Sequence, residues 1–362
     1  MTWAVAGGGT GGHVTMALAL AEEIRERGGD VFLLGTDQGL ERELVPAAGF
    51  ELVTFEARQV MGQRMLARLG ALAGLVATTV EARRALRGRS VTGLLSVGGY
   101  ASMPAVAAAA LSRIPTALVE PNGIPGRANR LMARFARLVF TGFEEANAHL
   151  PVPGDRIRLY GCPLRHELVA AFAARESRKP EPPFRLLVAG GSQGARQLNE
   201  GMMDVLPSLD PATVEIFHQT GRDDRARVDE AYRKAGFRAE VVDFTGDMPA
   251  RYGWADLAVC RAGALTVAEL ALAGLPSLLV PYPFAADDHQ TVNARALADA
   301  GGAILLESRP FDPATLANEL RALFSAPTRI TEMRRALASR ARPGAARAIV
   351  DDCKEIFGSM TS

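Results

Sequence analysis

Two successive series of short apolar runs constrain the fold of this chain most strongly. Each run is bounded by glycine or proline, and a longer helical pattern separates it from the next run. The first series lies at residues 3–6, 31–34, 93–97, 116–119 and 138–141. After a charged, proline-rich segment at residues 178–183, the second lies at residues 184–189, 214–219, 239–244, 257–260, 277–280 and 303–305. This alternation is typical of parallel sheets covered by helices and predicts two α/β domains.

The chain length agrees with two domains. A single hydrophobic core seldom grows beyond ~250 to 300 residues, and this chain has 362. We expect the first domain at residues 1–163 and the second at residues 164–343. Residues 344–362 are helical in pattern, and this C-terminal helix either completes the second domain or returns to the first.

Charge and cysteine usage exclude several classes of protein. The formal net charge is +1, which argues against a wholly basic nucleic-acid binder, so we expect no nucleic-acid partner. Cys162, Cys260 and Cys353 are too far apart for a disulfide framework or a CxxC zinc site, which favours a reducing cytoplasm. The first seven residues make a poor signal peptide. Glycines and a proline interrupt the uncharged stretch at residues 90–112, so we expect no transmembrane helix.

Three glycine-rich loops follow predicted strands and open helices. The first glycine loop covers residues 7–12, the second residues 98–102 and the third residues 190–195. Glycines allow the backbone to approach a diphosphate, and the amides at a helix start attract anions. One nucleotide diphosphate and one acceptor diphosphate would account for this much phosphate-binding backbone.

A dinucleotide-dependent oxidoreductase is an alternative at this stage. Gly7, Gly9 and Gly12 satisfy the GxGxxG fingerprint, and Asp37 lies near the end of the second strand, where an acidic residue would hold a ribose. The third glycine loop, in the second domain, makes this alternative less favourable. A nucleotide-sensing module without catalytic activity is a further alternative.

Five ordered motifs carry a resemblance to a known family. They are residues 8–13, residues 98–100, Asn122 within residues 121–126, residues 190–195 and residues 261–269. The chain resembles the undecaprenyldiphospho-muramoylpentapeptide β-N-acetylglucosaminyltransferases, the lipid II synthases of glycosyltransferase family 28. The resemblance implies the GT-B architecture, in which two Rossmann-like, doubly wound domains face a cleft. It places the acceptor on the first domain and UDP-N-acetylglucosamine (UDP-GlcNAc) mainly on the second.

The resemblance also implies a reaction and partners. N-acetylglucosamine is transferred with inversion to the C4 hydroxyl of N-acetylmuramic acid in lipid I, the undecaprenyl-linked acceptor. The expected location is the cytoplasmic face of the bacterial membrane, on an anionic inner-membrane surface, with the cell-wall synthesis machinery as a possible partner. Another membrane-associated GT-B transferase that acts on a glycolipid is the alternative within this class.

Site residues are carried over by resemblance to matching positions. His13 is the candidate catalytic base, because an unperturbed imidazole titrates near pH ~6.5, although it could instead cap the loop or donate to phosphate. Glu269 is expected to accept hydrogen bonds from the ribose hydroxyls. The remaining expected substrate-binding residues are Thr10, Gly11, Gly12, Asn122, Arg165, Ser192, Thr245, Ala264, Leu265, Thr266, Val267, Ala268, Gln290 and Asn293. For the acceptor diphosphate we expect Gly9, Gly98, Gly99 and Tyr100.

No metal ion and no cofactor are expected. A metal would need clustered carboxylates near the diphosphate. The available pairs, at residues 223–224, 287–288 and 351–352, lack a DxD pattern.

Residues 61–89 are the candidate membrane-contact segment. Apolar residues such as Leu69 and Val76 alternate there with arginines, including Arg83, Arg84 and Arg87. An apolar face can lie among lipid headgroups while arginines attract anionic lipid, at ~1 kcal/mol each. The alternative is an amphipathic helix that packs on its own domain. We favour a mixture of the two, in which the apolar stripe is partly core and the neighbouring arginines face lipid.

Overall fold

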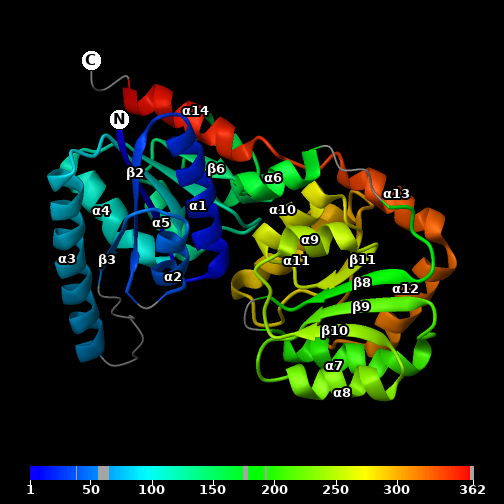
Figure 1. Ribbon diagram of the computed structural model, residues 1–362. Coiled ribbons are helices and arrows are strands. Elements are labelled where there is room, and N and C mark those ends of the chain that lie inside the picture. Colours follow the sequence, from blue (N-terminus) through cyan, green and yellow to red (C-terminus); the bar gives the residue numbers. More distant parts are fainter. Residues whose placement is uncertain (38, 56–64, 174–177, 192–193, 359–362) are drawn as a thin grey trace. The chain divides into compact units, whose positions relative to one another are not determined.

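The computed structural model describes residues 1–37, 39–55, 65–173, 178–191 and 194–358, with backbone alone at residues 65–73 (Figure 1). Two compact units divide the chain. Unit 1 comprises Met1–His166 and Pro343–Ser362, and unit 2 comprises Glu167–Arg342. The C-terminal helix therefore belongs to unit 1.

Unit 1 is built on a seven-stranded parallel sheet with strand order β3-β2-β1-β4-β5-β6-β7. The strands are β1 (Thr2–Gly7), β2 (Asp30–Thr36), β3 (Leu52–Phe55), β4 (Gly93–Gly98), β5 (Thr116–Glu120), β6 (Leu138–Thr141) and β7 (Ile157–Leu159). The five strands predicted for the first series are all present. The two edge strands, β3 and β7, were not predicted.

Helices cover both faces of this sheet. They are α1 (Gly11–Glu26), α2 (Glu41–Ala47), α3 (Met65–Gly88), α4 (Met103–Ser112), α5 (Arg127–Ala133) and α14 (Ala345–Gly358), with short 3-10 turns η1 (Tyr100–Ser102), η2 (Glu144–His149) and η3 (Gly154–Arg156). The small side chains of α4, such as Ala105 and Ala109, are fully buried and join the core beneath α3 and α5. Close packing of this kind excludes water and fixes the sheet edge that carries the loops.

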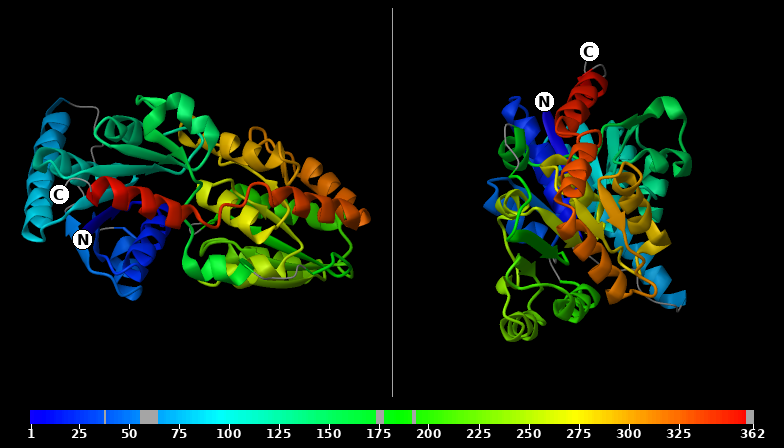
Figure 2. Two further views of the ribbon diagram at one scale, coloured as in Figure 1. Left: turned by 90° about the horizontal axis from the view of Figure 1, so that it is seen from above. Right: turned by 90° about the vertical axis from the view of Figure 1, so that its right-hand side faces the viewer.

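The C-terminal helix α14 packs beside α1 (Figures 1 and 2). Phe357 near its end lies against Trp3, with ring centroids 5.0 Å apart. Asp351 forms an ion pair with Arg27, the C-cap of α1, and Asp352 accepts a hydrogen bond from Tyr160 at 2.9 Å. Aromatic burial and these polar contacts together explain why the chain terminus returns to unit 1.

Unit 2 repeats the same plan with six parallel strands in the order β10-β9-β8-β11-β12-β13. The strands are β8 (Phe184–Ala189), β9 (Val214–Gln219), β10 (Arg238–Val242), β11 (Leu257–Cys260), β12 (Ser277–Leu279) and β13 (Ala303–Leu305). All six strands of the second series are therefore present.

The helices of unit 2 lie between and after these strands. They are α6 (His166–Ala173), which begins at the unit boundary, α7 (Arg196–Val205), α8 (Arg225–Lys234), α9 (Met248–Trp254), α10 (Ala264–Ala273), α11 (His289–Ala298), α12 (Pro313–Ser325) and α13 (Pro327–Leu337), with 3-10 turns η4 (Leu206–Ser208) and η5 (Ala286–Asp288). Leu186, Val188 and Val259 of the central strands are fully buried in one core with α7 and α12.

The strand orders indicate where each unit would bind a ligand. In each sheet, the second and third strands are added on one side of the first strand, and the fourth strand is added on its other side. As a result, β1 pairs with β4 and β8 pairs with β11. Ligands of doubly wound sheets bind at the carboxyl ends of the strands at this switch point. The first and second glycine loops lie there in unit 1, and the third glycine loop lies there in unit 2. Among the described residues, no helix is both long and apolar enough to cross a bilayer.

Candidate active site

The first glycine loop and His13 form the start of α1. Gly9 has a positive φ of 85°, which glycine adopts without strain. Thr10 is the N-cap, and its hydroxyl oxygen accepts from the His13 backbone amide at 3.4 Å. Gly11 and Gly12 therefore lie at the positive end of the helix dipole, which is a favourable position for an anion.

The His13 imidazole lies between the first and second glycine loops. Its Nδ1 is 2.8 Å from the Thr10 hydroxyl, and a side chain at Gly99 would lie 3.5 Å from the same nitrogen. Burial lowers the pKa of His13, and the negative charge of Glu41 partly opposes this effect. The imidazole is therefore neutral at pH 7, and within the described part of the chain its Nε2 has no hydrogen-bond partner. A neutral, oriented imidazole can accept a proton.

Glu41 supports the first glycine loop and was not predicted from the sequence. Its carboxylate is fully buried and accepts from the Thr36 amide at 2.9 Å, the Thr36 hydroxyl at 2.6 Å and the Gly9 amide at 3.4 Å. Side chains at Gly8, Gly35 or Gly39 would collide with Glu41. The glycines at 35 and 39 on either side of this carboxylate are the sequence signal that could have identified it.

The second glycine loop is fixed by a buried polar network. Gly98 and Gly99 have φ of 95° and 83°. The Gly99 amide donates to Asn129 at 3.3 Å, and the Asn129 amide group donates to Glu120 at 2.7 Å. Burial raises the pKa of Glu120 to about 7, against the hydrogen bonds from Asn122 and Asn129. Neither Glu120 nor Asn129 was predicted as a site residue.

Asn122 joins this network from the end of β5. Its backbone amide donates to Glu120 Oε1 at 2.9 Å, and its side-chain amide donates to the same oxygen at 3.2 Å. Tyr100 lies at the start of η1 with 75% of its surface exposed. The structure thus brings together the predicted residues of the first and second glycine loops with His13, and Asn122 lies on the adjoining strand end.

Arg165 lies apart from these loops. Its guanidinium donates to Glu22 Oε1 of α1 at 3.0 and 2.7 Å. Glu22 is eleven residues beyond Gly11 on the same helix, which corresponds to about 16 Å along the axis. Unit 1 therefore does not bring Arg165 to the first glycine loop, and its expected phosphate or uridine contact stays a prediction.

The third glycine loop connects β8 to α7. Gly191 and Gly194 have φ of 88° and 75°, and a side chain at Gly194 would collide with the Thr220 carbonyl oxygen. The loop is therefore held close to the end of β9 and leads into a helix start, as an anion site requires. Ser192 lies outside the described residues.

Helix α10 carries Glu269 and the predicted residues from Ala264 to Ala268. Gly263 is its N-cap. Tyr252 of α9 donates its hydroxyl to Glu269 Oε2 at 2.7 Å, and desolvation raises the pKa of Glu269 to about 7. The Tyr252 hydrogen bond fixes one oxygen of the Glu269 carboxyl group. Tyr252 was not predicted from the sequence.

Gln290 and Asn293 of α11 hold the neighbouring loops. Gln290 Oε1 accepts from the Tyr282 amide at 2.8 Å and from the Ala262 amide at 3.3 Å. Asn293 is fully buried and donates to the Ala262 carbonyl oxygen at 3.2 Å. Both side chains therefore position the β11 loop, and their expected contacts with sugar hydroxyls stay predictions.

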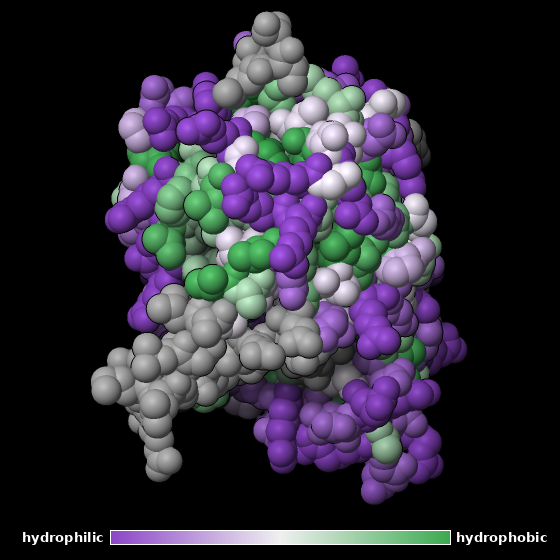
Figure 3. Space-filling view, turned by 90° about the vertical axis from the view of Figure 1, so that its left-hand side faces the viewer, coloured by the Kyte–Doolittle hydropathy of each residue, from purple (hydrophilic) through white to green (hydrophobic). Residues whose placement is uncertain are grey.

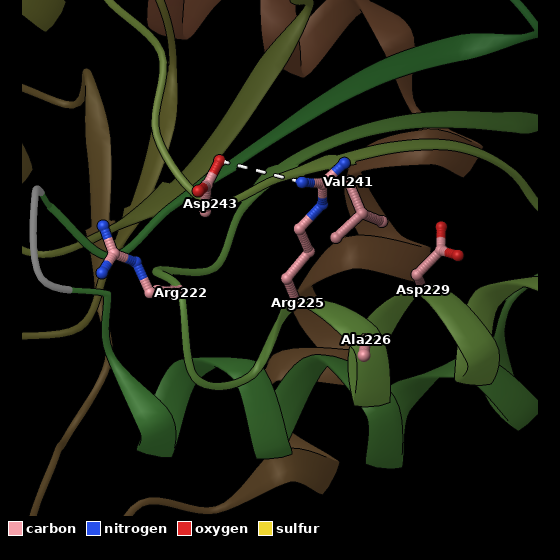
Figure 4. A pocket seen from close by; sticks show the side chains of 6 residues that line it. All are labelled: Arg222, Arg225, Ala226, Asp229, Val241 and Asp243. Carbon is pink, nitrogen blue, oxygen red and sulfur yellow. Dashed lines mark ion pairs between the residues drawn. The ribbon is translucent and has the colours of Figure 1, made fainter.

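Thr245, the expected uracil contact, follows β10. Its backbone amide donates to Gln219 Oε1 at 3.3 Å, and Gln219 was not predicted as a site residue. A pocket of about 430 Å³ lies nearby, lined by Arg222, Arg225, Ala226, Asp229, Val241 and Asp243 (Figure 4). Arg225 and Asp243 face one another across it at 4.0 Å. None of the predicted site residues lines this pocket.

The acidic pairs have protein partners. Asp224 accepts from Asn199 at 2.8 Å and from Arg227 at 2.8 Å, and Asp288 accepts from Thr291 at 2.8 Å. Asp351 and Asp352 hold α14 on unit 1. The expected absence of a metal ion stays a prediction.

Comparison with known proteins identifies the family. The glycosyltransferase family 28 N-terminal domain matches residues 3–141, and the family 28 C-terminal domain matches residues 185–349. An Anaeromyxobacter protein is 43% identical over 98% of this chain and 93% of its own length, and one from Myxococcus xanthus is 41% identical over 98% and 92%. Both are named UDP-N-acetylglucosamine–N-acetylmuramyl-(pentapeptide) pyrophosphoryl-undecaprenol N-acetylglucosamine transferase. The chain belongs to glycosyltransferase family 28.

Solved structures agree with this family. The crystal structure of MurG from Acinetobacter baumannii has a TM-score of 0.79 at 31% identity and covers 98% of this chain and 99% of its own. A UDP-GlcNAc 2-epimerase from Neisseria meningitidis is 13% identical with a TM-score of 0.68, covering 97% and 99%, and shares the fold alone. The predicted class of two Rossmann-like domains and the predicted glycosyltransferase activity are therefore confirmed. Family 28 membership disfavours the oxidoreductase alternative.

Proposed function

We propose that this family 28 enzyme transfers N-acetylglucosamine from UDP-GlcNAc to the C4 hydroxyl of N-acetylmuramic acid in lipid I. The observation that carries the proposal is the 43% identity over 98% of the chain to transferases named for this donor and acceptor. The geometry of both units supports it, because each unit presents a glycine loop at its switch point.

In unit 1 the first and second glycine loops would bind the acceptor diphosphate, and His13 would act as the base. The C4 oxygen attacks C1 of the donor sugar, and its proton passes to His13 Nε2. The bond between C1 and the β-phosphate oxygen breaks, and its electron pair leaves with UDP. Attack opposite the leaving group gives inversion and a β-1,4 linkage.

In unit 2 the third glycine loop and the start of α7 would stabilise the charge on departing UDP. Glu269, fixed by Tyr252, would accept hydrogen bonds from the ribose hydroxyls when it is ionised. Thr245 would contact the uracil through its backbone, and the Gln290 amide nitrogen would reach the sugar hydroxyls. No cofactor and no metal ion are required in this scheme.

We further propose that unit 1 contacts an anionic membrane surface through α3. Val76 and Val80 are 58% and 43% exposed, and Arg84 and Arg87 are exposed further along the helix. At 100° per residue these four positions fall within an arc of about 80° on one helix face. Figure 3, which looks onto the α3 side of unit 1, shows apolar and hydrophilic residues side by side.

The four exposed residues combine an apolar contact with positive charge, which is the pattern that favours an anionic headgroup layer. Arg83 is instead half-buried and donates to Ser112 of α4 at 3.4 Å, while Arg89 forms an ion pair with Glu51. Among the arginines of this segment whose side chains are described, we therefore propose Arg84 and Arg87 for the membrane contact. Residues 61–64, and the side chains at residues 65–73, lie outside the described part. Contact with the cell-wall synthesis machinery is left as a prediction.

A transfer assay tests the proposed function. Labelled UDP-GlcNAc is mixed with a short-chain lipid I analogue, with a diacylglycerol acceptor, or with no acceptor, in the presence of a metal chelator. We expect a labelled disaccharide from the lipid I analogue alone. Transfer to diacylglycerol but not to lipid I would instead identify a glycolipid transferase.

A further inference from the structure

Gln219 lies between two loops that the proposed donor site uses for different parts of UDP. It is the last residue of β9, only 4% exposed, and β9 pairs with β8 on one side and β10 on the other. The third glycine loop follows β8, and Thr245 follows β10. A side chain at the end of β9 can therefore reach both.

The Gln219 amide bonds to each loop with a different atom. Its nitrogen Nε2 donates to the Gly191 carbonyl oxygen at 2.9 Å, and its oxygen Oε1 accepts from the Thr245 backbone amide at 3.3 Å. Since glutamine carries both a donor and an acceptor on one planar group, it satisfies both loops at once. A carboxylate or an apolar side chain of the same size satisfies one or neither.

The bond to Gly191 has a consequence for anion binding. The Gly191 carbonyl oxygen accepts from Gln219 and also from the Gly194 amide at 3.0 Å. A carbonyl oxygen carries partial negative charge and would repel a diphosphate if it turned toward the ligand. With two donors on this oxygen, the Gly191 carbonyl group is held toward the protein.

The end of β9 is itself rigid. The Thr220 amide donates to Val242 at 3.0 Å, and the Gly221 amide donates to Asp243 at 3.1 Å, so the chain stays tied to β10 beyond the strand. Asn199 of α7 donates to the Thr220 carbonyl oxygen at 3.0 Å and contacts the buried His218 at 3.0 Å. Gln219 therefore projects from a fixed support.

We propose that Gln219 is a positioning residue that couples the diphosphate and uracil subsites of the donor site. It fixes the third glycine loop and the Thr245 backbone in one relative arrangement, so that a single nucleoside diphosphate meets both. The inference rests on the proposed function for the ligand, and on the two hydrogen bonds for the role.

Two substitutions separate positioning from general stability. In Gln219→Glu the ionised carboxylate still accepts from Thr245 but cannot donate to Gly191, whereas the protonated acid donates through its hydroxyl. In Gln219→Met both bonds are lost at every pH. The full-length protein is titrated with UDP and with uridine between pH 6 and pH 9, and thermal unfolding is followed in parallel.

Loss of the bond to Gly191 should weaken UDP binding about 10- to 100-fold, because a partly buried carbonyl oxygen beside the diphosphate subsite loses one of its two donors. For Gln219→Glu we expect the ratio of variant to wild-type Kd for UDP to rise with pH, since protonation restores the donor. For Gln219→Met we expect the same ratio of Kd values to be high at every pH. Uridine lacks the diphosphate, so its Kd in Gln219→Glu should stay within about threefold of wild type.

Other outcomes overturn the inference. UDP affinities within threefold of wild type in both folded variants would show that Gln219 does not position the donor. If Gln219→Glu weakened the binding of uridine and of UDP equally, and by the same factor at every pH, Gln219 would contribute only to the general stability of the protein. Failure of the wild-type protein to bind UDP would refute the proposed function itself, which the variants alone would not do.

Discussion

The two ionisable side chains proposed to contact substrates, His13 and Glu269, are both desolvated. Burial lowers the pKa of His13 and raises that of Glu269 to about 7. In each case the neutral form is favoured, because removing a charge from water is costly. His13 is therefore in its neutral form at pH 7 and can accept a proton. Glu269, by contrast, changes its protonation state near pH 7.

His13→Gln should lower kcat by about 10²- to 10⁴-fold, the usual contribution of a general base. The KM for UDP-GlcNAc should change little, because the donor is assigned to unit 2. In the wild type, kcat/KM should fall as the pH drops below the His13 pKa, which lies below ~6.5, and the variant should lack this limb. Steady-state kinetics between pH 5 and pH 9 measure both effects.

The exposed His149→Gln in unit 1 is the matched control and should retain wild-type rates. A His13→Gln enzyme that keeps kcat within tenfold, with a raised KM for the acceptor, would instead assign His13 to phosphate binding. That result would favour the alternative role considered for this residue.

Tyr252→Phe should move the pH dependence of UDP binding. Glu269 accepts ribose hydroxyls best when ionised, so wild-type affinity should fall as the pH drops through about 7. The Tyr252 hydrogen bond favours the ionised form, and its loss should raise the Glu269 pKa by about one unit, or about 1.4 kcal/mol. Calorimetric titration with UDP from pH 6 to pH 9 should show the midpoint shifted upward.

Tyr160→Phe removes the same kind of hydroxyl-to-carboxylate hydrogen bond in unit 1, where Tyr160 donates to Asp352. It should leave the midpoint for UDP unchanged. An unshifted or lowered midpoint in Tyr252→Phe would show that Glu269 does not bind the ribose as an ionised group.

The sequence analysis predicted residues in the glycine loops and in the motifs beside them. It did not predict the side chains that support these loops through hydrogen bonds. Gly99 and Glu269 belong to contiguous motifs, so they were predicted. Glu41 and Gln219 bond to Gly9 and Gly191, which lie 32 and 28 positions away along the chain. Glu120 bonds to Asn129, nine positions further on, in another element. Their partners depend on strand order and register, which a local pattern does not contain.

At the scale of elements, α3 combines packing on α4 with an exposed face. Its buried side includes Ala82 and Leu86, which are fully buried in the core of unit 1. The opposite side carries Val76, Val80, Arg84 and Arg87. The burial pattern of the described residues of α3 therefore agrees with a segment that is partly core, and contact of its exposed side with lipid stays a proposal.

Arg84→Gln combined with Arg87→Gln should weaken binding to anionic vesicles. At about 1 kcal/mol for each arginine, the pair contributes about 2 kcal/mol, or about 30-fold in partitioning. Cosedimentation with phosphatidylglycerol vesicles at low salt measures the loss, and added salt should reduce wild-type binding as well.

Arg233→Gln with Lys234→Gln in α8 of unit 2 removes the same charge from another exposed helix. This control should bind vesicles like the wild type. Equal loss in both double variants would indicate a net-charge effect, and no loss in either would remove α3 from the membrane proposal.

Strands inside the sheets were easier to predict than strands at the edges. Residues of β4 and β5 are buried throughout, and most of them are apolar. By contrast, β3 and β7 have edge positions and partly exposed residues, such as Thr54 and Leu159. A half-exposed strand of three or four residues has no periodicity that distinguishes it from a loop.

At the scale of the whole molecule, the two units share the same central strand order, and we propose that unit 1 binds the acceptor and unit 2 the donor. Unit 1 places a neutral histidine between two glycine loops, and unit 2 places a glycine loop, an orienting glutamine and a tyrosine-supported glutamate around one switch point. The repeated rhythm of the sequence predicted both sheets. It left open the return of α14 to unit 1, which depends on contacts of Phe357 with Trp3 and of Asp351 with Arg27.

The most direct test of the central claim is the structure of the transfer product. The enzyme is incubated with UDP-GlcNAc and a lipid I analogue, and the product is analysed by NMR and mass spectrometry while released UDP is counted. We expect one UDP for each disaccharide, with N-acetylglucosamine β-linked to C4 of N-acetylmuramic acid. An α-linkage, attachment at another hydroxyl, or UDP release without a disaccharide would contradict the account.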